Sequence, residues 1–120
     1  MRNLNLKDYN CKVSAEDKNK PGAIVEVSAP YHVKASVLTL MFIPDLKLNG
    51  VELLKTNILA MKIEGCVEDN ILLEDEEWAR LKRAVDTHKG FGRNDVELVD
   101  RILNAVEIKS SEIKLKGKAK

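Results

Sequence analysis

The fold class is decided by the stretch LNLKDYNCKV (residues 4–13), in which apolar and polar residues alternate. Such alternation is typical of a β-strand with one buried face. Residues 23–27 (AIVEV) repeat the pattern after the charged, turn-rich segment 14–22. We therefore predict a β-hairpin whose connecting loop is mobile. The alternation slips at Asp8, which indicates a bulge in the first strand.

Beyond Pro30 the apolar residues recur at helical spacing. A helix of about ten residues is expected from Val33 onward, since Val37, Leu40 and Met41 follow it on one face and Pro44 ends the segment. The middle of this segment is apolar all round, so a buried strand is the alternative.

A second helix is expected to begin after Asn49. Its side chain is predicted to cap the helix, with Glu52 reaching back as in a capping box, and Gly65 is predicted to end it. One apolar face is predicted for this helix, made of Val51, Leu54, Ile58 and Met61.

The second half of the chain repeats this plan. Residues 71–73 predict a short extended segment, and Asp75 is expected to cap a helix with an acidic first turn. The buried stripe of that helix is predicted to be Trp78, Leu81 and Val85. Residues 94–97 (NDVE) resemble residues 49–52 (NGVE) and predict a last helix that carries Val96, Val99, Ile102, Leu103 and Val106. The resemblance indicates either a repeat or a shared capping preference.

These elements predict an α+β fold, in which an N-terminal β-hairpin packs on about four helices arranged as two helical hairpins. The chain has 120 residues, with 20 Lys and Arg against 19 Asp and Glu. This length is typical of one domain. We assign residues 1–108 to the domain and residues 109–120 to a lysine-rich tail. The tail is expected to be solvated, although Ile113 and Leu115 alternate as an edge strand or a partner-docking strand would.

Several classes of protein are excluded by composition. The longest uncharged run, residues 35–44, is far shorter than the roughly 20 residues of a membrane-spanning helix. The first residues lack an apolar stretch of signal-peptide length, so we expect a cytoplasmic protein. A net charge of +1 argues against strong nucleic-acid binding. Cys11 and Cys66 have no second Cys or His at ligand spacing, so neither a zinc site nor a disulfide framework is expected.

No catalytic constellation is visible. The carboxylates of residues 74–77 are expected to serve helix capping rather than a metal ion, because consecutive helical residues point in different directions. His32 and His88 have no partner at a spacing that implies a triad. No phosphate-binding or dinucleotide fingerprint is present. We therefore expect a non-enzymatic protein with no cofactor and no metal.

One segment combines the features of a ligand-binding loop. Two glycines let a backbone approach a ligand closely, a helix start offers unpaired amides, and cations attract an anion. The opposing interpretation is a plain connector in which Gly90 is left-handed and Phe91 packs under the turn. Asp95 and Glu97 would also repel an anion. The candidate anion or ligand site consists of Lys89, Gly90, Phe91, Gly92, Arg93, Asn94 and Trp78, in which either Phe91 or Trp78 would stack on a base.

A resemblance to known proteins is carried by three segments: LNLKDY (residues 4–9), PDLKLNGVELL (44–54) and GFGRNDVELV (90–99). Together they resemble small proteins encoded by tailed bacteriophages and prophages. The resemblance implies a protein that acts by binding, as a virion or assembly component or as an inhibitor of host defence, in the host cytosol or in the virion.

Together these observations predict a self-associating binding or assembly module, hence a homo-oligomer with a protein partner. The first alternative is an anti-defence protein that captures an anionic signalling nucleotide, or another phosphorylated small molecule, through Lys89 and Arg93, or inhibits a host effector. The second is a nucleic-acid-binding accessory protein that uses the lysines of residues 109–120.

Overall fold

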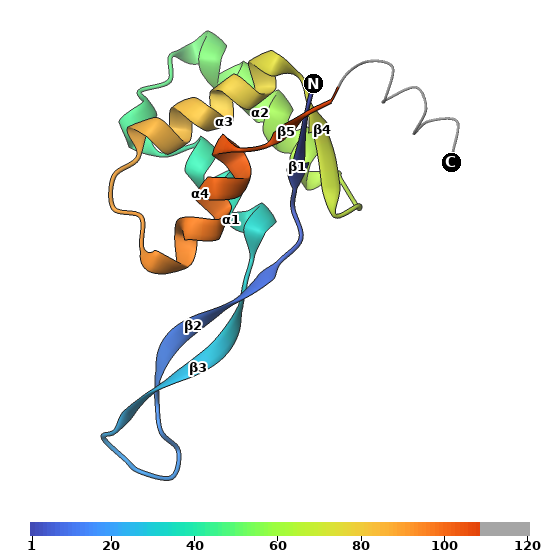
Figure 1. Ribbon diagram of the computed structural model, residues 1–120. Helices are drawn as coiled ribbons and strands as arrows, with labels where there is room; N and C mark the ends of the chain where they lie inside the picture. The colour runs from blue at the N-terminus through green and yellow to red at the C-terminus, as the bar shows by residue number, and fades with distance from the viewer. Residues whose placement is uncertain (109–120) are drawn as a thin grey trace.

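The computed structural model describes residues 1–108. It confirms an α+β fold with an N-terminal β-hairpin (Figure 1). The helices are α1 (Val33–Met41), α2 (Gly50–Glu64), α3 (Asp75–Thr87) and α4 (Val96–Leu103), with 3-10 turns η1 (Pro44–Leu46) and η2 (Arg93–Asp95). The strands are β1 (Arg2–Asn5), β2 (Tyr9–Glu16), β3 (Ile24–Tyr31), β4 (Asn70–Leu73) and β5 (Val106–Glu107). The residues predicted for the tail, 109–120, lie outside the described part of the chain.

The predicted first strand is in fact two strands that belong to different sheets. β1 is the middle strand of an antiparallel sheet ordered β4-β1-β5, and β2 pairs only with β3. Between them the chain turns, with the backbone N–H of Lys7 donating to the Asn5 side chain and that of Leu6 donating to the carbonyl of Asp69. The slip in alternation at Asp8 therefore marks a change of sheet, and the predicted bulge is wrong.

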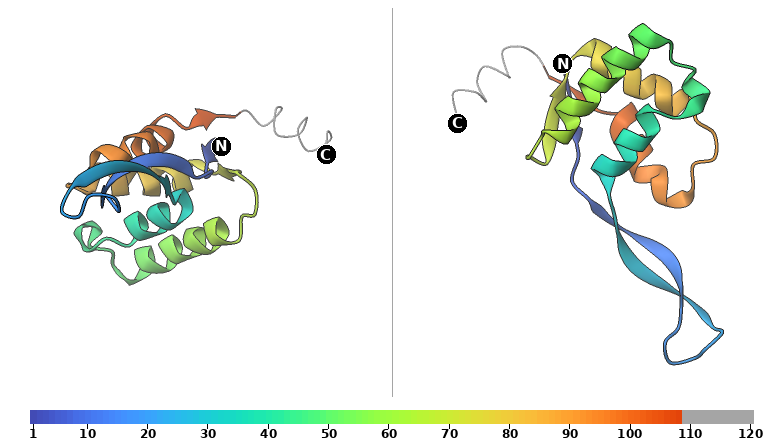
Figure 2. Two further views of the ribbon diagram at one scale, coloured as in Figure 1. Left: turned by 90° about the horizontal axis from the view of Figure 1, so that it is seen from below. Right: turned by 180° about the vertical axis from the view of Figure 1, so that it is seen from behind.

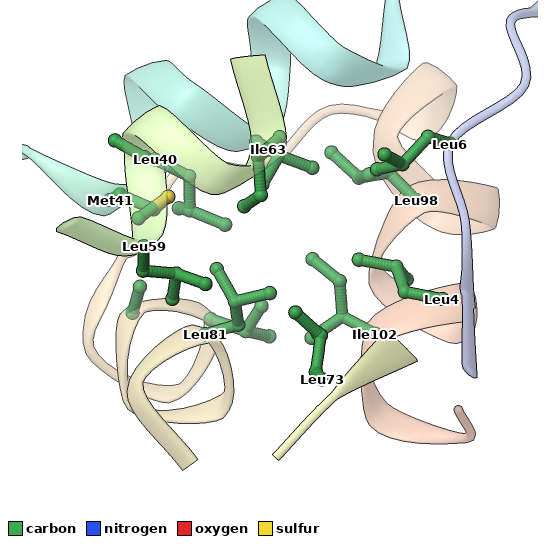
Figure 3. Close-up of a cluster of buried hydrophobic side chains, with 14 of the residues drawn as sticks. Leu4, Leu6, Leu40, Met41, Leu59, Ile63, Leu73, Leu81, Leu98 and Ile102 are labelled. Carbon is green, nitrogen blue, oxygen red and sulfur yellow. The ribbon is translucent and has the colours of Figure 1, made fainter. Parts of the chain in front are cut away.

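The helices form one layered body around a shared core. α1 packs against both α2 and α3, and α3 packs against α4, as the predicted pairs of helical hairpins require (Figure 2). The predicted stripes of α1 and α3 face this core, except that Trp78 is only partly buried. Figure 3 shows the core side chains of the helices meeting those of β1 and β4, among them Leu4, Leu59, Ile63, Leu73, Leu81 and Ile102.

The predicted core face of α2 is wrong. Val51, Leu54, Ile58 and Met61 are exposed at 62%, 66%, 67% and 63% of their surface. The helix instead buries the adjoining face, which consists of Thr56, Leu59, Ala60 and Ile63. Its ends are as predicted, because Asn49 accepts from the backbone N–H of Glu52 at 2.9 Å and Gly65 follows the last turn. The carboxylate of Glu52 does not reach back, since it pairs with Arg80 at 2.6 Å.

The last two helices begin differently from the prediction. The N-cap residue of α3 is Glu74 rather than Asp75, and the Glu77 side chain reaches back to accept from the backbone N–H of Glu74 at 2.8 Å. α4 follows a 3-10 turn, and Asn94 does not cap it. The start signals of α2 and α4 are therefore not equivalent.

α4 is also shorter than the sequence predicts. It ends at Leu103, and Val106 lies in strand β5. Val96 is 64% exposed, whereas Ile102 is fully buried. The chain leaves the helix early because β5 completes the sheet beside β1, pairing Arg2 with Glu107.

The β2–β3 hairpin, which we call the arm (residues 9–31), projects from the helical body (Figure 1). The molecule is 57 Å long, and its radius of gyration of 17.2 Å exceeds the roughly 14 Å expected for a compact chain of this length. The strands extend to Glu16 and Ile24, so the loop is shorter than predicted. The predicted packing of the hairpin on the helices holds only at the base of the arm.

Within the described residues, no helix has the length and apolar character that crossing a membrane requires.

Candidate functional site

In the candidate loop between α3 and α4, the carboxylate of Asp95 takes the position in which an external anion would bind. The backbone N–H of Gly92 donates to Oδ2 of Asp95 at 2.7 Å, and Asp95 Oδ1 accepts from the hydroxyl of Tyr31 at 2.5 Å. A carboxylate at the start of a helix satisfies the amides and the positive dipole end that an external anion would otherwise use. The geometry therefore favours an internal structural role for this turn.

The rest of the loop has the features of a connector. Gly90 has a φ of +107°, the left-handed region that favours glycine. Phe91 packs against the core and meets His88 edge-on, with ring centroids 4.6 Å apart. Lys89 and Arg93 are exposed to solvent.

Trp78 does not join this loop. Its Nε1 donates to the carbonyl of Ile102 at 2.7 Å, and the guanidinium of Arg2 lies 3.8 Å from its ring centre. It stands in the first turn of α3, whereas Gly90 follows the other end of that helix, about 14 Å further along its axis. Of the two proposed stacking residues, Phe91 therefore lies in the loop and Trp78 does not.

The loop serves instead as the anchor of the arm. The hydroxyl of Tyr9 donates to the carbonyl of Asn94 at 2.6 Å, and the Asn94 side chain donates to the carbonyl of Lys12 at 2.9 Å. Tyr9 and Tyr31 face each other across the two strands and stack with ring centroids 4.6 Å apart. With the bond from Tyr31 to Asp95, they fix the base of the arm to the turn before α4.

The sequence did not predict this junction between arm and body, which consists of Tyr9, Tyr31, Asn94 and Asp95. One signal was nevertheless available. The chain has only two tyrosines. They stand at the body ends of the two observed strands of the arm, where they pair with each other. A tyrosine carries an apolar ring and a polar hydroxyl, which suits it to the border between a core and an exposed segment.

Burial at the junction changes the titration of both phenols. It raises the pKa of Tyr31 to about 12, with the hydrogen bond to the Asp95 carboxylate adding to the effect. Burial also raises the pKa of Tyr9. On the other side of the base, the backbone N–H of Val33 and the ring of His32 bond to Asp8 and lower the pKa of that carboxyl. The contacts at the base of the arm thus favour neutral phenols and an ionised Asp8 carboxylate.

A cleft of about 490 Å³ opens beside the junction, between the base of the arm, α1 and the loop. Its walls are largely apolar, and Nδ1 of His88 at its edge is buried without a hydrogen-bond partner in the described part of the chain. Its polar lining includes Tyr31, His32, Ser36 and Asp95. Within residues 1–108, no group of three or more His, Cys, Asp or Glu side chains is placed to hold a metal ion.

Among the apolar surfaces that stay exposed in the described structure, two are extended enough to dock a partner. The first, which we call the α2 stripe, consists of the four most exposed apolar side chains of α2: Val51, Leu54, Ile58 and Met61. Their spacing of three, four and three residues places them in one row along the helix. A row of this kind is typical of a helix that packs against a partner.

The second surface is one face of the arm. Directly opposed residues of antiparallel strands point to the same side, and alternate pairs share a face. The pairs on one side are all apolar: Tyr9 with Tyr31, Cys11 with Ala29, Val13 with Val27, and Ala15 with Val25. The pairs on the other side carry the charges: Asn10 with Pro30, Lys12 with Ser28, Ser14 with Glu26, and Glu16 with Ile24. The arm is therefore an amphipathic ribbon.

No protein-family model, no curated protein and no solved structure matches this chain.

Proposed function

We propose that the protein is a non-enzymatic, self-associating binding or assembly module. The observation that carries the proposal is the α2 stripe, in which four large apolar side chains are each exposed at 62–67%. Single exposed apolar residues are ordinary, but a continuous row of them marks an interaction surface. The row also lies on a long, capped helix, which gives a partner a rigid surface to bind.

The energy available from the α2 stripe is sufficient for association. Fully burying a side chain of this size contributes about 1.5–3 kcal/mol, and here about two thirds of each side chain is still exposed. Four such side chains therefore contribute several kcal/mol, of the order needed to offset the lost freedom of two molecules. No further conformational change is required to expose them.

The resemblance of residues 4–9, 44–54 and 90–99 to small phage and prophage proteins supports a role in virion assembly or in binding a host protein. The proposed site of action is the bacterial cytosol, or the virion after assembly. The alternative of nucleotide capture receives less support, because Asp95 occupies the amide of Gly92 that an anion would need. The nucleic-acid alternative depends on residues 109–120, which lie outside the described structure.

Light scattering at micromolar concentration tests self-association. The protein is expected to form a defined oligomer, and the double substitution Leu54→Glu with Ile58→Glu is expected to dissociate it. Val96→Glu is a matched control, since Val96 is 64% exposed and lies on another helix. A wild-type chain that stays monomeric, alone and in phage lysate, would overturn the proposal. So would dissociation by the control to the same degree.

A further inference from the structure

We propose that the occupant of the α2 stripe is the arm of a second copy of this chain, docked through its apolar face. This inference rests on the proposed function and names the partner of the same surface. It follows from the chemistry, the size and the placement of the two uncovered surfaces.

The apolar face of the arm would be stabilised by packing against another element. A two-stranded hairpin alone is marginally stable in water, and it gains stability when a helix or a further strand covers its apolar face. Beyond the two tyrosines, the largest side chains on that face are Val13, Val25 and Val27, which are 37%, 37% and 39% exposed. Branched side chains are stiff and pack well against a neighbouring apolar surface.

The two surfaces match in size. Cys11 to Ala15 spans four residue steps of a strand, about 13 Å, while Val51 to Met61 spans ten steps of a helix, about 15 Å. Two strands about 5 Å apart, with their side chains, give a ribbon close to the 10–12 Å width of a helix. One arm therefore covers one α2 stripe from end to end.

The placement of the surfaces requires two molecules. The arm is anchored at the turn before α4 through Asn94 and Asp95. Figure 2 (left) shows α2 on the opposite side of the body from α4, with α1 between them. The arm leaves the body at its base and points away from it (Figure 1). An arm therefore cannot lie on the α2 stripe of its own chain.

A contact between unlike surfaces explains both of them at once. Pairing α2 with α2 would leave the apolar face of the arm in water, and pairing arm with arm would leave the α2 stripe there. In the arm-to-stripe contact each chain donates one arm and receives one. A single contact of these dimensions buries less area than the roughly 800 Å² per partner of a stable interface. A closed assembly with two contacts per chain is therefore expected.

A charge pair placed on the apolar face of the arm tests the inference. Val13→Glu with Val27→Lys keeps opposite charges on directly paired residues, so the hairpin is retained while its apolar face is interrupted. The dissociation constant is expected to rise at least about tenfold, as for the α2 stripe variant. Ile24→Lys is the matched control, because Ile24 is 74% exposed on the other face of the arm, opposite Glu16; it is expected to leave the assembly intact.

A photo-crosslinking residue at Lys55, which is exposed beside the α2 stripe, identifies the occupant directly. Mass spectrometry of the crosslinked dimer is expected to find residues 9–31 of the second chain. Capture of α2 by α2, together with an arm variant that still assembles, would overturn the arm as occupant while leaving self-association intact. A chain that is monomeric before any substitution would overturn both proposals.

Discussion

The first strand of the body, β1, and the first strand of the arm, β2, share one alternating sequence pattern but lie in opposite environments. In residues 4–13 the alternation is continuous enough to predict one strand, yet Leu4 in β1 is 1% exposed and Val13 in β2 is 37% exposed. The body supplies helices to cover the apolar face of β1, as Figure 3 shows for Leu4. On the apolar face of the arm only Tyr9 and Tyr31 pack against the core, while Val13, Val25 and Val27 stay exposed. The comparison teaches that alternation specifies a strand but not what covers it.

The largest expected effect is the difference in stability between a truncation in the body and a similar truncation in the arm. Leu81→Ala removes a side chain that is fully buried in the body, and it is expected to lower the free energy of unfolding by about 3 kcal/mol, through lost transfer energy and the cavity left behind. Val27→Ala on the arm is expected to lower it by less than about 1 kcal/mol. Denaturant unfolding below the concentration at which the protein associates measures both values.

The control for this comparison is the slope of the unfolding curve, which should be unchanged by either substitution. If Val27→Ala is as destabilising as Leu81→Ala in the monomer, the arm is packed on its own body and the contrast between the two regions is wrong.

A smaller effect is expected at the junction that joins the two regions. Tyr31→Phe removes the hydrogen bond to Asp95 and keeps the ring stacked on Tyr9, so it is expected to cost about 1 kcal/mol. Because the bond anchors the arm, amide hydrogen exchange should accelerate in residues 9–31 more than in the helices. Equal acceleration in the body and the arm would show that Asp95 stabilises the whole fold rather than the arm.

The same contrast explains how much of the structure the sequence could predict. The stripe of α3 was predictable because that helix carries one apolar row, and that of α1 because its apolar residues recur at helical spacing up to Pro44. α2 carries two: a row of large side chains, and an adjoining row in which Thr56 and Ala60 accompany Leu59 and Ile63. The larger row was predicted to be buried, but the small side chains of the other row let α2 approach the body closely.

The candidate site could be predicted only as a loop. Its glycine conformation at Gly90 and the packing of Phe91 follow from local residue types. The bonds that give the loop its role join Tyr9 to Asn94 and Tyr31 to Asp95, residues 85 and 64 positions apart. No local pattern encodes contacts of that range, so the anchoring of the arm became visible only in three dimensions.

The smallest expected effect is a shift in titration that reports on the junction without altering its residues. Burial and the Asp95 hydrogen bond raise the pKa of Tyr31 to about 12, and burial raises that of Tyr9. A phenol whose pKa is higher in the folded state than its ordinary value of 10 stabilises that state fully below pH 10, and this contribution is lost as the pH rises toward 12. Tyrosinate absorbance of the folded protein should therefore develop above pH 10 for both phenols.

The chain in denaturant is the reference for this titration, and both phenols should then ionise near pH 10. Since Tyr9 and Tyr31 are the two tyrosines of the sequence, no other phenol contributes. Ionisation of either one places a negative charge at the base of the arm. The protection of the amides of residues 9–31, relative to an unfolded chain at the same pH, should therefore fall over this pH range, before that of the helices. Half of the tyrosinate signal appearing near pH 10 in the folded protein would mean that one phenol faces solvent, and that the arm is not held at its base by both rings.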